Sequence, residues 1–167
     1  MKLNGFYLIL HNIRSAYNVG SIFRTADAIG VEKIFLCGIT PTPEKVNSNW
    51  SIHTGKAIKK TALGAEKSVA WQYYSKTIYI IKKLKAQGVR IVALEQTEKS
   101  KNLFEWKPYL PLALILGNEL KGIPSSILKE SDEIIEIPML GKKESLNVSV
   151  SFAVVGYYIF EKLFSKI

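Results

Sequence analysis

Short apolar runs alternate along this chain with longer segments whose apolar residues recur every three or four positions. Each short run predicts a strand, because it is rich in β-branched residues and too short for a helix. The predicted strands span residues 6–13, 32–37, 90–94, 112–116 and 134–137. Helical spacing predicts a helix that follows Asn18 and ends at Gly30, another over 77–87, and a short one over 125–129. This order indicates an α/β protein with a mostly parallel sheet, helices on both faces and a ligand site at the carboxyl ends of the strands.

The C-terminal helix carries two apolar stripes, and Ser145 offers a hydroxyl that can cap its first turn. The first stripe consists of Leu146, Val150, Ala153, Tyr157, Phe160 and Phe164. The second consists of Val148, Phe152, Val155, Ile159 and Leu163. One sheet cannot cover both stripes, so we expect one to pack on the sheet and the other on a second copy of the chain. A helix fully buried within a single domain is the alternative.

The segment between the second and third predicted strands is polar at first and then basic. Residues 38–55 hold threonines, prolines and asparagines, which predicts a surface loop. Residues 56–67 carry four lysines and lead to the aromatic residues Trp71, Tyr73 and Tyr74. Such a mixture suits phosphate contact and base stacking, but the aromatic residues can equally form a local hydrophobic patch.

Composition narrows the class of protein. The 23 Lys and Arg residues exceed the 14 Asp and Glu residues, and the resulting net charge of +9 attracts polyanions such as RNA, although basic residues also serve as solubilisers. Cys37 is the only cysteine, which excludes an internal disulfide framework, and with only His11 and His53 as other soft ligands no metal site is expected. The apolar run near the N-terminus is too short for a membrane span and lacks a signal-peptide layout, so we expect a cytoplasmic protein.

Three polar clusters follow predicted strands, at 18–24, 117–122 and the loop up to Asn147. We expect them to converge at one edge of the sheet. No GxGxxG follows a strand, and the 117–122 cluster continues into Ile123 and Pro124 instead of the Lys and Ser or Thr of a phosphate-binding loop. The chain also lacks a GxSxG elbow. These absences argue against a Rossmann dehydrogenase, an ATPase and an α/β-hydrolase.

Three segments in these clusters resemble the motifs of a known family. They are NVGSIFRTADAIG (Asn18–Gly30), LILGNELKGIP (Leu114–Pro124) and EIPMLGKKESLNVSVSFAVV (Glu136–Val155). In this order they resemble the three motifs of the SpoU-type (TrmH-like) RNA ribose 2′-O-methyltransferases of the SPOUT superfamily. The run KTALGAEK (Lys60–Lys67) also resembles a stretch common in that class, so the resemblance covers nearly the whole chain.

The resemblance implies a fold and a cofactor that periodicity does not show. The fold is an α/β-knot, in which the C-terminal part of the chain is threaded through a loop as a deep trefoil knot. S-adenosylmethionine binds bent within the knot, held largely by backbone groups. By motif position these groups belong to Gly117, Ile137 and Leu146, with Leu94, Met139 and Ser145 nearby. Family enzymes are homodimers with the active site at the interface, in agreement with the two-faced C-terminal helix.

The resemblance also implies catalytic roles. Arg24 of the second protomer is expected to bind the adjacent phosphate and to position the ribose hydroxyl or help remove its proton, while Asn18, Glu119, Ser145 and Asn147 hold substrate and loop. Each residue has a simpler interpretation: Arg24 as an exposed partner of Asp27, and the others as helix caps or first-turn residues. The expected RNA contacts are Arg14, Lys56, Lys59 and Lys60.

These observations predict one catalytic domain over residues 1–167, without an N-terminal RNA-recruiting domain. The predicted reaction is S-adenosylmethionine-dependent methylation of a ribose 2′-hydroxyl in structured RNA, with tRNA slightly favoured over rRNA. Two alternatives stay open. One is a non-catalytic, knotted RNA-binding dimer, and the other is a base methyltransferase of the same superfamily.

Overall fold

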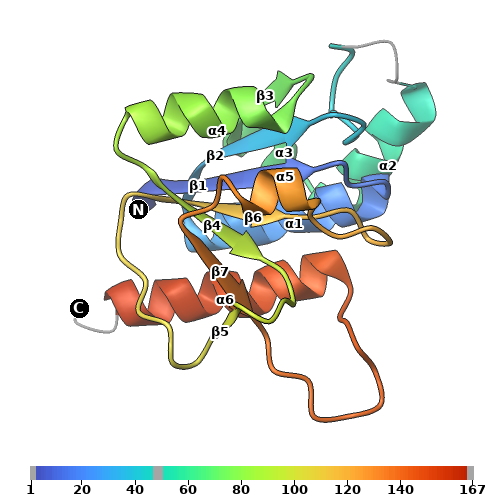
Figure 1. The fold of residues 1–167 in the computed structure, drawn as a ribbon. Helices are drawn as coiled ribbons and strands as arrows, with labels where there is room; N and C mark the ends of the chain where they lie inside the picture. The colour runs from blue at the N-terminus through green and yellow to red at the C-terminus, as the bar shows by residue number, and fades with distance from the viewer. Residues whose placement is uncertain (1–2, 47–50, 165–167) are drawn as a thin grey trace.

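Seven strands and six helices make up the described part of the chain, residues 3–46 and 51–164 of a computed structural model (Figure 1). The strands are β1 (Leu3–His11), β2 (Val31–Cys37), β3 (Ala70–Tyr74), β4 (Arg90–Leu94), β5 (Lys101–Asn102), β6 (Leu112–Leu116) and β7 (Glu133–Glu136). The helices are α1 (Ala16–Ile29), α2 (Ile52–Ala62), α3 (Ala65–Ser68), α4 (Thr77–Ala86), α5 (Ser125–Leu128) and α6 (Val148–Phe164). None of these helices combines the length and apolar composition needed to cross a membrane.

The strands form one sheet in the order β3-β2-β1-β6-β4-β7-β5, and every neighbouring pair is parallel. The predicted mostly parallel sheet is therefore confirmed, and β4 and β6 have the predicted bounds. Two edge strands were missed. β3 contains the aromatic residues that follow the lysine-rich segment, and β5 has only two residues, too few to give a pattern.

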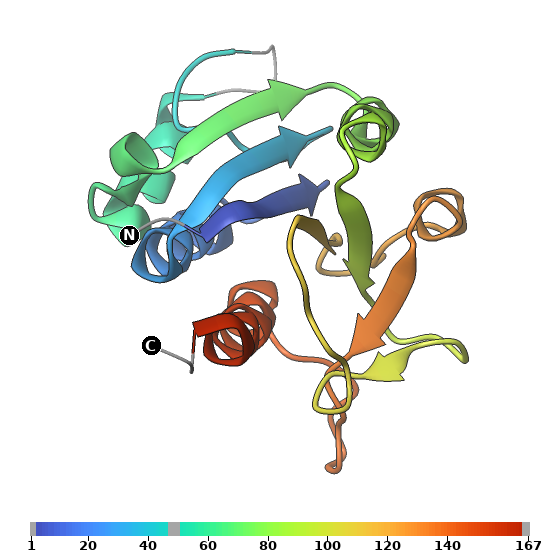
Figure 2. The same cartoon turned by 90° about the vertical axis from the view of Figure 1, so that its left-hand side faces the viewer.

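Helices cover both faces of the sheet, as predicted. Successive residues of β1 alternate between two cores: Leu8 and Leu10 face the side of α1 and α6, whereas Ile9 faces the side of α4 and α5. Figure 2 shows these two helix pairs on opposite sides of the sheet. The helices α2 and α3 pack against α1.

From β1 the chain adds strands towards one edge of the sheet, and from the neighbouring β6 it proceeds towards the other edge. After β1 the chain crosses by α1 to β2 and then reaches β3 at one edge, whereas after β6 it crosses by α5 on the other face towards β7. Neighbouring strands whose crossovers leave on opposite faces form a topological switch point, where the carboxyl ends of the strands leave a crevice. The loops that follow β1 and β6 are therefore placed to form a binding site.

The helix α6 keeps one of its two apolar stripes exposed. Phe152, Val155 and Ile159 of the second stripe are fully buried. On the first stripe, by contrast, Tyr157 is 52% exposed and Phe160 39% exposed. The alternative of a helix buried on all sides within one domain is therefore wrong, and the exposed stripe is free to contact another molecule.

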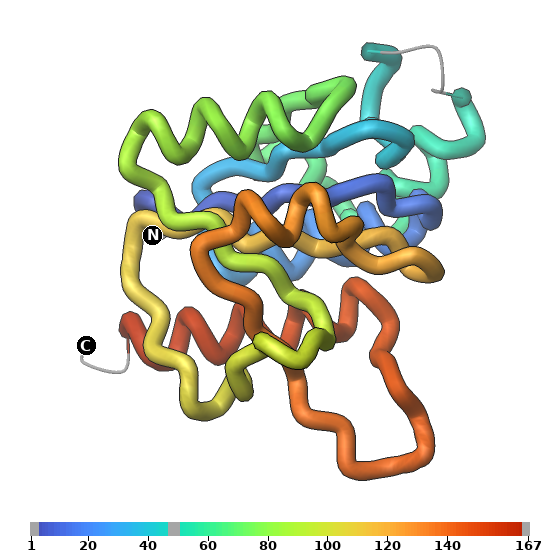
Figure 3. Tube along the Cα trace, in the orientation of Figure 1, coloured from blue at the N-terminus to red at the C-terminus, as the bar shows by residue number. Residues whose placement is uncertain are grey.

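The segment that leads from β5 back to β6 passes across the C-terminal half of α6, as the tube in Figure 3 shows. The hydroxyl of Tyr158 donates a hydrogen bond to the carbonyl oxygen of Trp106 at 2.7 Å and lies 3.3 Å from that of Phe104. The residues 137–147, which join β7 to α6, loop away from the sheet (Figure 3).

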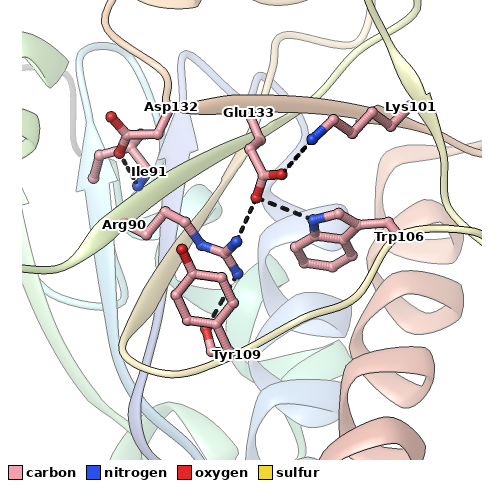
Figure 4. Close-up of polar contacts among 7 residues, drawn as sticks. All are labelled: Arg90, Ile91, Lys101, Trp106, Tyr109, Asp132 and Glu133. Atoms are coloured by element: carbon pink, nitrogen blue, oxygen red, sulfur yellow. Dashed lines mark hydrogen bonds and ion pairs between the residues drawn. The ribbon is translucent and has the colours of Figure 1, made fainter.

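A cluster of charged and aromatic side chains binds the segment 101–109 to the end of the sheet where β4, β5 and β7 begin (Figure 4). The carboxylate of Glu133 accepts hydrogen bonds from Arg90 Nη1 at 2.5 Å, Lys101 Nζ at 2.7 Å and Trp106 Nε1 at 3.1 Å. The guanidinium of Arg90 also lies over the ring of Tyr109, 3.4 Å from its centroid. Burial raises the pKa of Glu133, but the Lys101 and Trp106 hydrogen bonds and the Arg90 charge outweigh this effect and hold it below its usual value.

Of the residues considered as helix caps near the polar clusters, Asn147 caps its helix, whereas Asn18 and Ser145 do not. The N-cap of α1 is Ser15, whose hydroxyl accepts a hydrogen bond from the Asn18 backbone, so Asn18 lies inside the first turn. The residue that precedes α6 is Asn147, whose side-chain oxygen accepts from the Ser149 N–H at 2.9 Å. Ser145 lies two residues too early to cap that turn. In both cases the helix began at a different position from the one that the apolar spacing indicated.

Candidate functional site

A cavity of about 560 Å³, hereafter the first cavity, lies at the carboxyl ends of β4, β6 and β7. Its walls come from the ends of these strands, the loop 117–122 and the loop 137–147. All six residues predicted to bind a cofactor line it: Leu94, Gly117, Ile137, Met139, Ser145 and Leu146. Glu119 and Asn147 line it as well. The structure thus brings together residues as far apart in the sequence as Leu94 and Asn147.

The loop 117–122 is closed tightly on itself by its own hydrogen bonds. Asn118 and Gly122 exchange two backbone hydrogen bonds, and the side-chain oxygen of Asn118 accepts from the N–H groups of Leu120 and Lys121, both at 3.0 Å. A Cβ atom at Gly117 would lie 2.6 Å from the backbone carbon of Gly122, so only glycine fits there. These contacts fix the wall that the loop presents to the cavity.

Glu119 joins this loop to the start of α1. Its carboxylate accepts hydrogen bonds from the backbone N–H groups of Arg14 at 2.8 Å and Ser15 at 3.0 Å, and from Asn18 Nδ2 at 3.0 Å. Burial raises the pKa of Glu119, but these hydrogen bonds, led by those from the backbone, lower the pKa by more than burial raises it. The net pKa therefore lies below its usual value. At neutral pH the side chain is a fixed carboxylate that accepts hydrogen bonds and does not donate them.

The amides of Asn18 and Asn147 continue the chain of hydrogen bonds from Glu119. The Ser149 N–H can only donate, so it fixes the oxygen of Asn147. Asn147 Nδ2 then donates to Asn18 Oδ1 at 3.1 Å, and Asn18 Nδ2 donates to Glu119. The three polar clusters of the sequence therefore converge, as predicted, and each amide has one defined orientation.

Three of the predicted catalytic residues are exposed, Asn147 among them. Ser145 lines the first cavity and is exposed. Arg24 is exposed on α1 and does not line the cavity. In the described part of the chain no ion pair joins Arg24 to Asp27, whose carboxylate instead accepts a hydrogen bond from Ser68 Oγ at 2.5 Å. The interpretation of Arg24 as a salt-bridged surface residue is therefore not supported.

The first cavity is acidic although the chain is strongly basic. Four carboxylates line it, together with the apolar side chains of the strand ends. The carboxylates belong to Glu95, Glu119, Glu136 and Glu144. Sequence reasoning had identified only Glu119 among them. A signal was available for Glu95 and Glu136, because each stands at the carboxyl end of a strand. Carboxylates beside apolar walls suit a cationic ligand with an apolar part.

A second cavity of about 540 Å³ lies on the other side of the loop 117–122, at the carboxyl ends of β1, β2 and β6. It is lined by His11, Asn12, Arg14, Ile39, Asn118, Leu120, Lys121, Gly122 and Pro124. Of the predicted RNA contacts, only Arg14 lies here, and it is exposed.

The other predicted RNA contacts, Lys56, Lys59 and Lys60, are exposed on α2. The aromatic residues after this lysine-rich segment belong to β3, where Trp71 and Tyr73 are partly buried against the core next to α1 and Tyr74 against the opposite one. These aromatic residues therefore pack against the two cores on opposite faces of the sheet and do not form one local hydrophobic patch. Within the described residues, no group of three or more His, Cys, Asp or Glu side chains is arranged to hold a metal ion.

The sequence of the chain matches one family. The model of the SpoU rRNA Methylase family matches residues 5–157, so the chain belongs to this family. The chain is 32% identical over 149 residues to a tRNA (guanosine(18)-2′-O)-methyltransferase of Aquifex aeolicus, an alignment that covers 87% of this chain and 64% of that relative. It is 30% identical over 148 residues to a 23S rRNA (guanosine-2′-O-)-methyltransferase of Neisseria meningitidis serogroup B, with 89% and 55% covered. The chain thus spans less than two thirds of either relative.

Solved structures support the assignment of the fold. The TrmH/SpoU tRNA modifying enzyme of A. aeolicus superposes with a TM-score of 0.84 and 27% identity, over 99% of this chain and 78% of that one. An AdoMet-bound rRNA methyltransferase of Sinorhizobium meliloti superposes with a TM-score of 0.80 at 24% identity, over 95% and 56% of the two chains. The predicted fold class, the α/β fold of the SPOUT methyltransferases, is confirmed.

Proposed function

We propose that this protein methylates a ribose 2′-hydroxyl in structured RNA, with S-adenosylmethionine as the methyl donor. The observation that carries the proposal is the chain of hydrogen bonds through Glu119, Asn18 and Asn147 at the rim of the first cavity. It joins all three family motifs at one place. The named relatives that act on ribose 2′-hydroxyls of tRNA and rRNA support the reaction class.

The residues of the first cavity fit the proposed cofactor. The volume lies within the range of small-molecule sites, and the apolar strand ends offer a surface for an adenine ring. The carboxylates of Glu136 and Glu144 suit the positive charges of the ammonium and sulfonium groups. When bound, S-adenosylmethionine supplies an activated methyl group. The AdoMet-bound neighbour of the same fold is in keeping with this use of the site.

The protein's main task is then to position the hydroxyl and to let its proton leave. Glu119 is held by backbone N–H groups, so it keeps Asn18 at a fixed place and Asn18 in turn orients Asn147. Ser145 and Asn147 stand on the loop that would close over substrate and cofactor. A guanidinium binds phosphate oxygens through its planar set of N–H donors and has no acceptor for a proton, so we assign to Arg24 the binding of the neighbouring phosphate, whose oxygen takes the proton.

A homodimer completes this site in our proposal. Arg24 lies on the exposed side of α1, the helix that packs beside α6. Burial of the exposed α6 stripe against a second copy would bring Arg24 to the interface, from where it serves the first cavity of the partner. The contacts of Tyr158 with Trp106 and Phe104 place the segment 103–111 against α6, in keeping with the expected trefoil knot. We favour tRNA over rRNA as substrate, and the cytoplasm as the place of action.

The test is transfer of labelled methyl groups from S-adenosylmethionine to total RNA from cells that lack the protein, followed by digestion to nucleosides. Wild type should yield a ribose-methylated nucleoside, and Arg24→Ala should reduce the rate by about 100-fold or more while cofactor binding is unchanged. Lys82→Ala, which removes an exposed charge from α4, is the matched control and should keep the wild-type rate.

Three results would overturn the proposal or part of it. A labelled base would replace it with base methylation. RNA and cofactor binding without any product would leave a non-catalytic RNA-binding protein. Wild-type activity of Arg24→Ala would remove the role assigned to that residue.

A further inference from the structure

The second cavity occupies the topological switch point of the sheet. It opens at the carboxyl ends of β1 and β6, the two neighbouring strands whose crossovers leave on opposite faces. In open α/β sheets this is the place where ligands bind. The proposed cofactor site lies beside it, across β6, β4 and β7, and the loop 117–122 forms a wall of both cavities.

The chemistry of the second cavity is opposite to that of the first. None of the nine residues that line it is acidic, whereas Arg14 and Lys121 bring two positive charges to its rim. Its apolar surface includes Ile39, which is 52% exposed, and Leu120, which is 77% exposed. Exposed apolar side chains between cations are the combination that binds a nucleotide, since the base packs on the apolar surface and the phosphate meets the cations.

The remaining polar groups of this cavity hold its walls in place. Asn12 Oδ1 accepts from the Ile39 N–H at 3.1 Å, so its Nδ2 is the group that faces His11 Nε2, also at 3.1 Å. His11 Nδ1 then carries a proton and donates to Thr77 Oγ1 at 2.7 Å. Asn118 Nδ2 donates to the Asn12 carbonyl at 2.7 Å. The walls are therefore fixed by internal hydrogen bonds, and the cationic side chains are the polar groups left to meet a ligand.

We propose that the second cavity binds an unpaired nucleotide of the RNA substrate next to the methylated ribose. The base packs against Ile39 and Leu120, and Arg14 and Lys121 contact its phosphate groups. This inference rests on the proposed function, because the loop 117–122 sets the distance between this nucleotide and the hydroxyl presented to the first cavity. The second cavity thereby contributes to the choice of substrate sequence.

Two substitutions separate the base contact from the phosphate contact. Ile39→Ser removes apolar surface, and Lys121→Gln removes a charge. In the structure the recorded hydrogen bonds of these two residues use only their backbone N–H groups, to Asn12 and Asn118, so both variants should fold. The measurement is RNA affinity as a function of salt concentration, with the KM for RNA and the Kd for S-adenosylmethionine beside it.

The two variants should differ in their salt dependence. For Lys121→Gln we expect weaker RNA binding and a slope of log K against log salt that is smaller by about 0.7. For Ile39→Ser we expect about tenfold weaker binding with an unchanged slope. Both should raise the KM for RNA and leave kcat and cofactor affinity at wild-type values. Lys107→Gln removes an exposed charge near the amino ends of β4 and β7, far from both cavities. It should change neither RNA affinity, salt slope, KM, kcat nor cofactor affinity. Ile39→Val keeps an apolar side chain at this position and should bind RNA with wild-type affinity.

The outcomes distinguish failure of this inference from failure of the proposed function. If wild type methylates RNA but Ile39→Ser and Lys121→Gln behave like Lys107→Gln, the second cavity takes no nucleotide. If Ile39→Ser changes the salt slope and Lys121→Gln does not, the assigned contacts are wrong. If wild type methylates no RNA, the proposed function fails first, and with it this use of the second cavity.

Discussion

At the scale of single residues, Glu119 connects the proposed site to the frame of the protein. Its carboxylate ties the loop after β6 to the two residues that precede α1, 104 and 105 positions earlier in the sequence. Because backbone N–H groups cannot move independently of the chain, they hold the carboxylate more firmly than side chains would. The same contacts lower its pKa, so its effect on stability depends on pH.

Glu119→Gln should make this dependence visible. A group whose pKa is lowered by folding stabilises the protein above its unfolded pKa, near 4.5, and loses that contribution as pH falls through the folded pKa. We expect the variant to be less stable than wild type by about 1–2 kcal/mol at pH 7, where solvent partly screens the half-buried group. The difference should shrink below pH 4.

Urea unfolding of both proteins at pH 7 and pH 3.5 measures the effect of Glu119→Gln. Glu98→Gln, at an exposed position, is the control and should match wild type at both pH values. An equal loss of stability for Glu119→Gln at pH 7 and pH 3.5 would show that the charge of Glu119 is unimportant.

At the scale of elements, the position of α1 depends on one glycine. A Cβ atom at Gly20 would lie 2.4 Å from the carbonyl oxygen of Ile58 and 3.1 Å from the backbone nitrogen of Ala62. Gly20→Ala should therefore push α2 away from α1 and destabilise the protein by about 1–3 kcal/mol, in spite of the better helix propensity of alanine. Thermal unfolding tests this. Gly141→Ala adds the same methyl group where nothing lies within 4 Å and should keep the wild-type Tm.

The segment 101–109 depends in the same way on Glu133. Glu133→Gln keeps the shape of the side chain but leaves Arg90 and Lys101 without their counter-ion in a cluster where Arg90 is 11% and Glu133 16% exposed. Loss of one partner of such a pair should cost about 3 kcal/mol. Chemical unfolding at pH 7 is the measurement. Glu105→Gln, which removes the same negative charge from an exposed position of the same segment, is the control. Similar midpoints for the two variants would refute this role of the cluster.

Elements with a clear period were predictable from the sequence, and elements fixed by distant contacts were not. Continuous apolar runs gave the bounds of β4 and β6, because buried parallel strands need no polar positions. The strand β5 exists only because Lys101 and Asn102 pair with β7. Among the residues that line the first cavity, Glu119 and Asn147 were identified by motif. Glu95 and Glu136 were missed although each stands at the carboxyl end of a strand, because that position alone does not distinguish a carboxylate in a cavity from one in solvent.

At the scale of the whole molecule, the exposed stripe of α6 predicts the oligomeric state. The rings of Phe160 and Phe164 stack with centroids 5.3 Å apart, and Tyr157 meets Phe160 edge to face on the same surface. In the proposed dimer, Phe160→Glu should yield a monomer and reduce methyl transfer about tenfold or more, because a charge there would have to be buried at the interface. Light scattering with gel filtration measures the mass.

The stability of the monomer should hardly change, since Phe160 is 39% exposed within one chain. Tyr79→Glu places the same charge on α4, at a side chain 54% exposed on the other face of the sheet, and should leave a dimer. A dimeric and active Phe160→Glu protein would exclude the α6 stripe as the interface.

The order of the strands also has a consequence for synthesis of the protein. Leu10 in β1 pairs with Leu116 in β6, which the ribosome adds 106 residues later. At about 5–20 residues per second, β1 therefore waits about 5–20 s for its second neighbour. Four of its side chains, Phe6, Leu8, Ile9 and Leu10, are fully buried in the finished sheet. During that interval the nascent chain presents an unpaired, apolar strand edge, the kind of surface to which chaperones and other nascent chains bind.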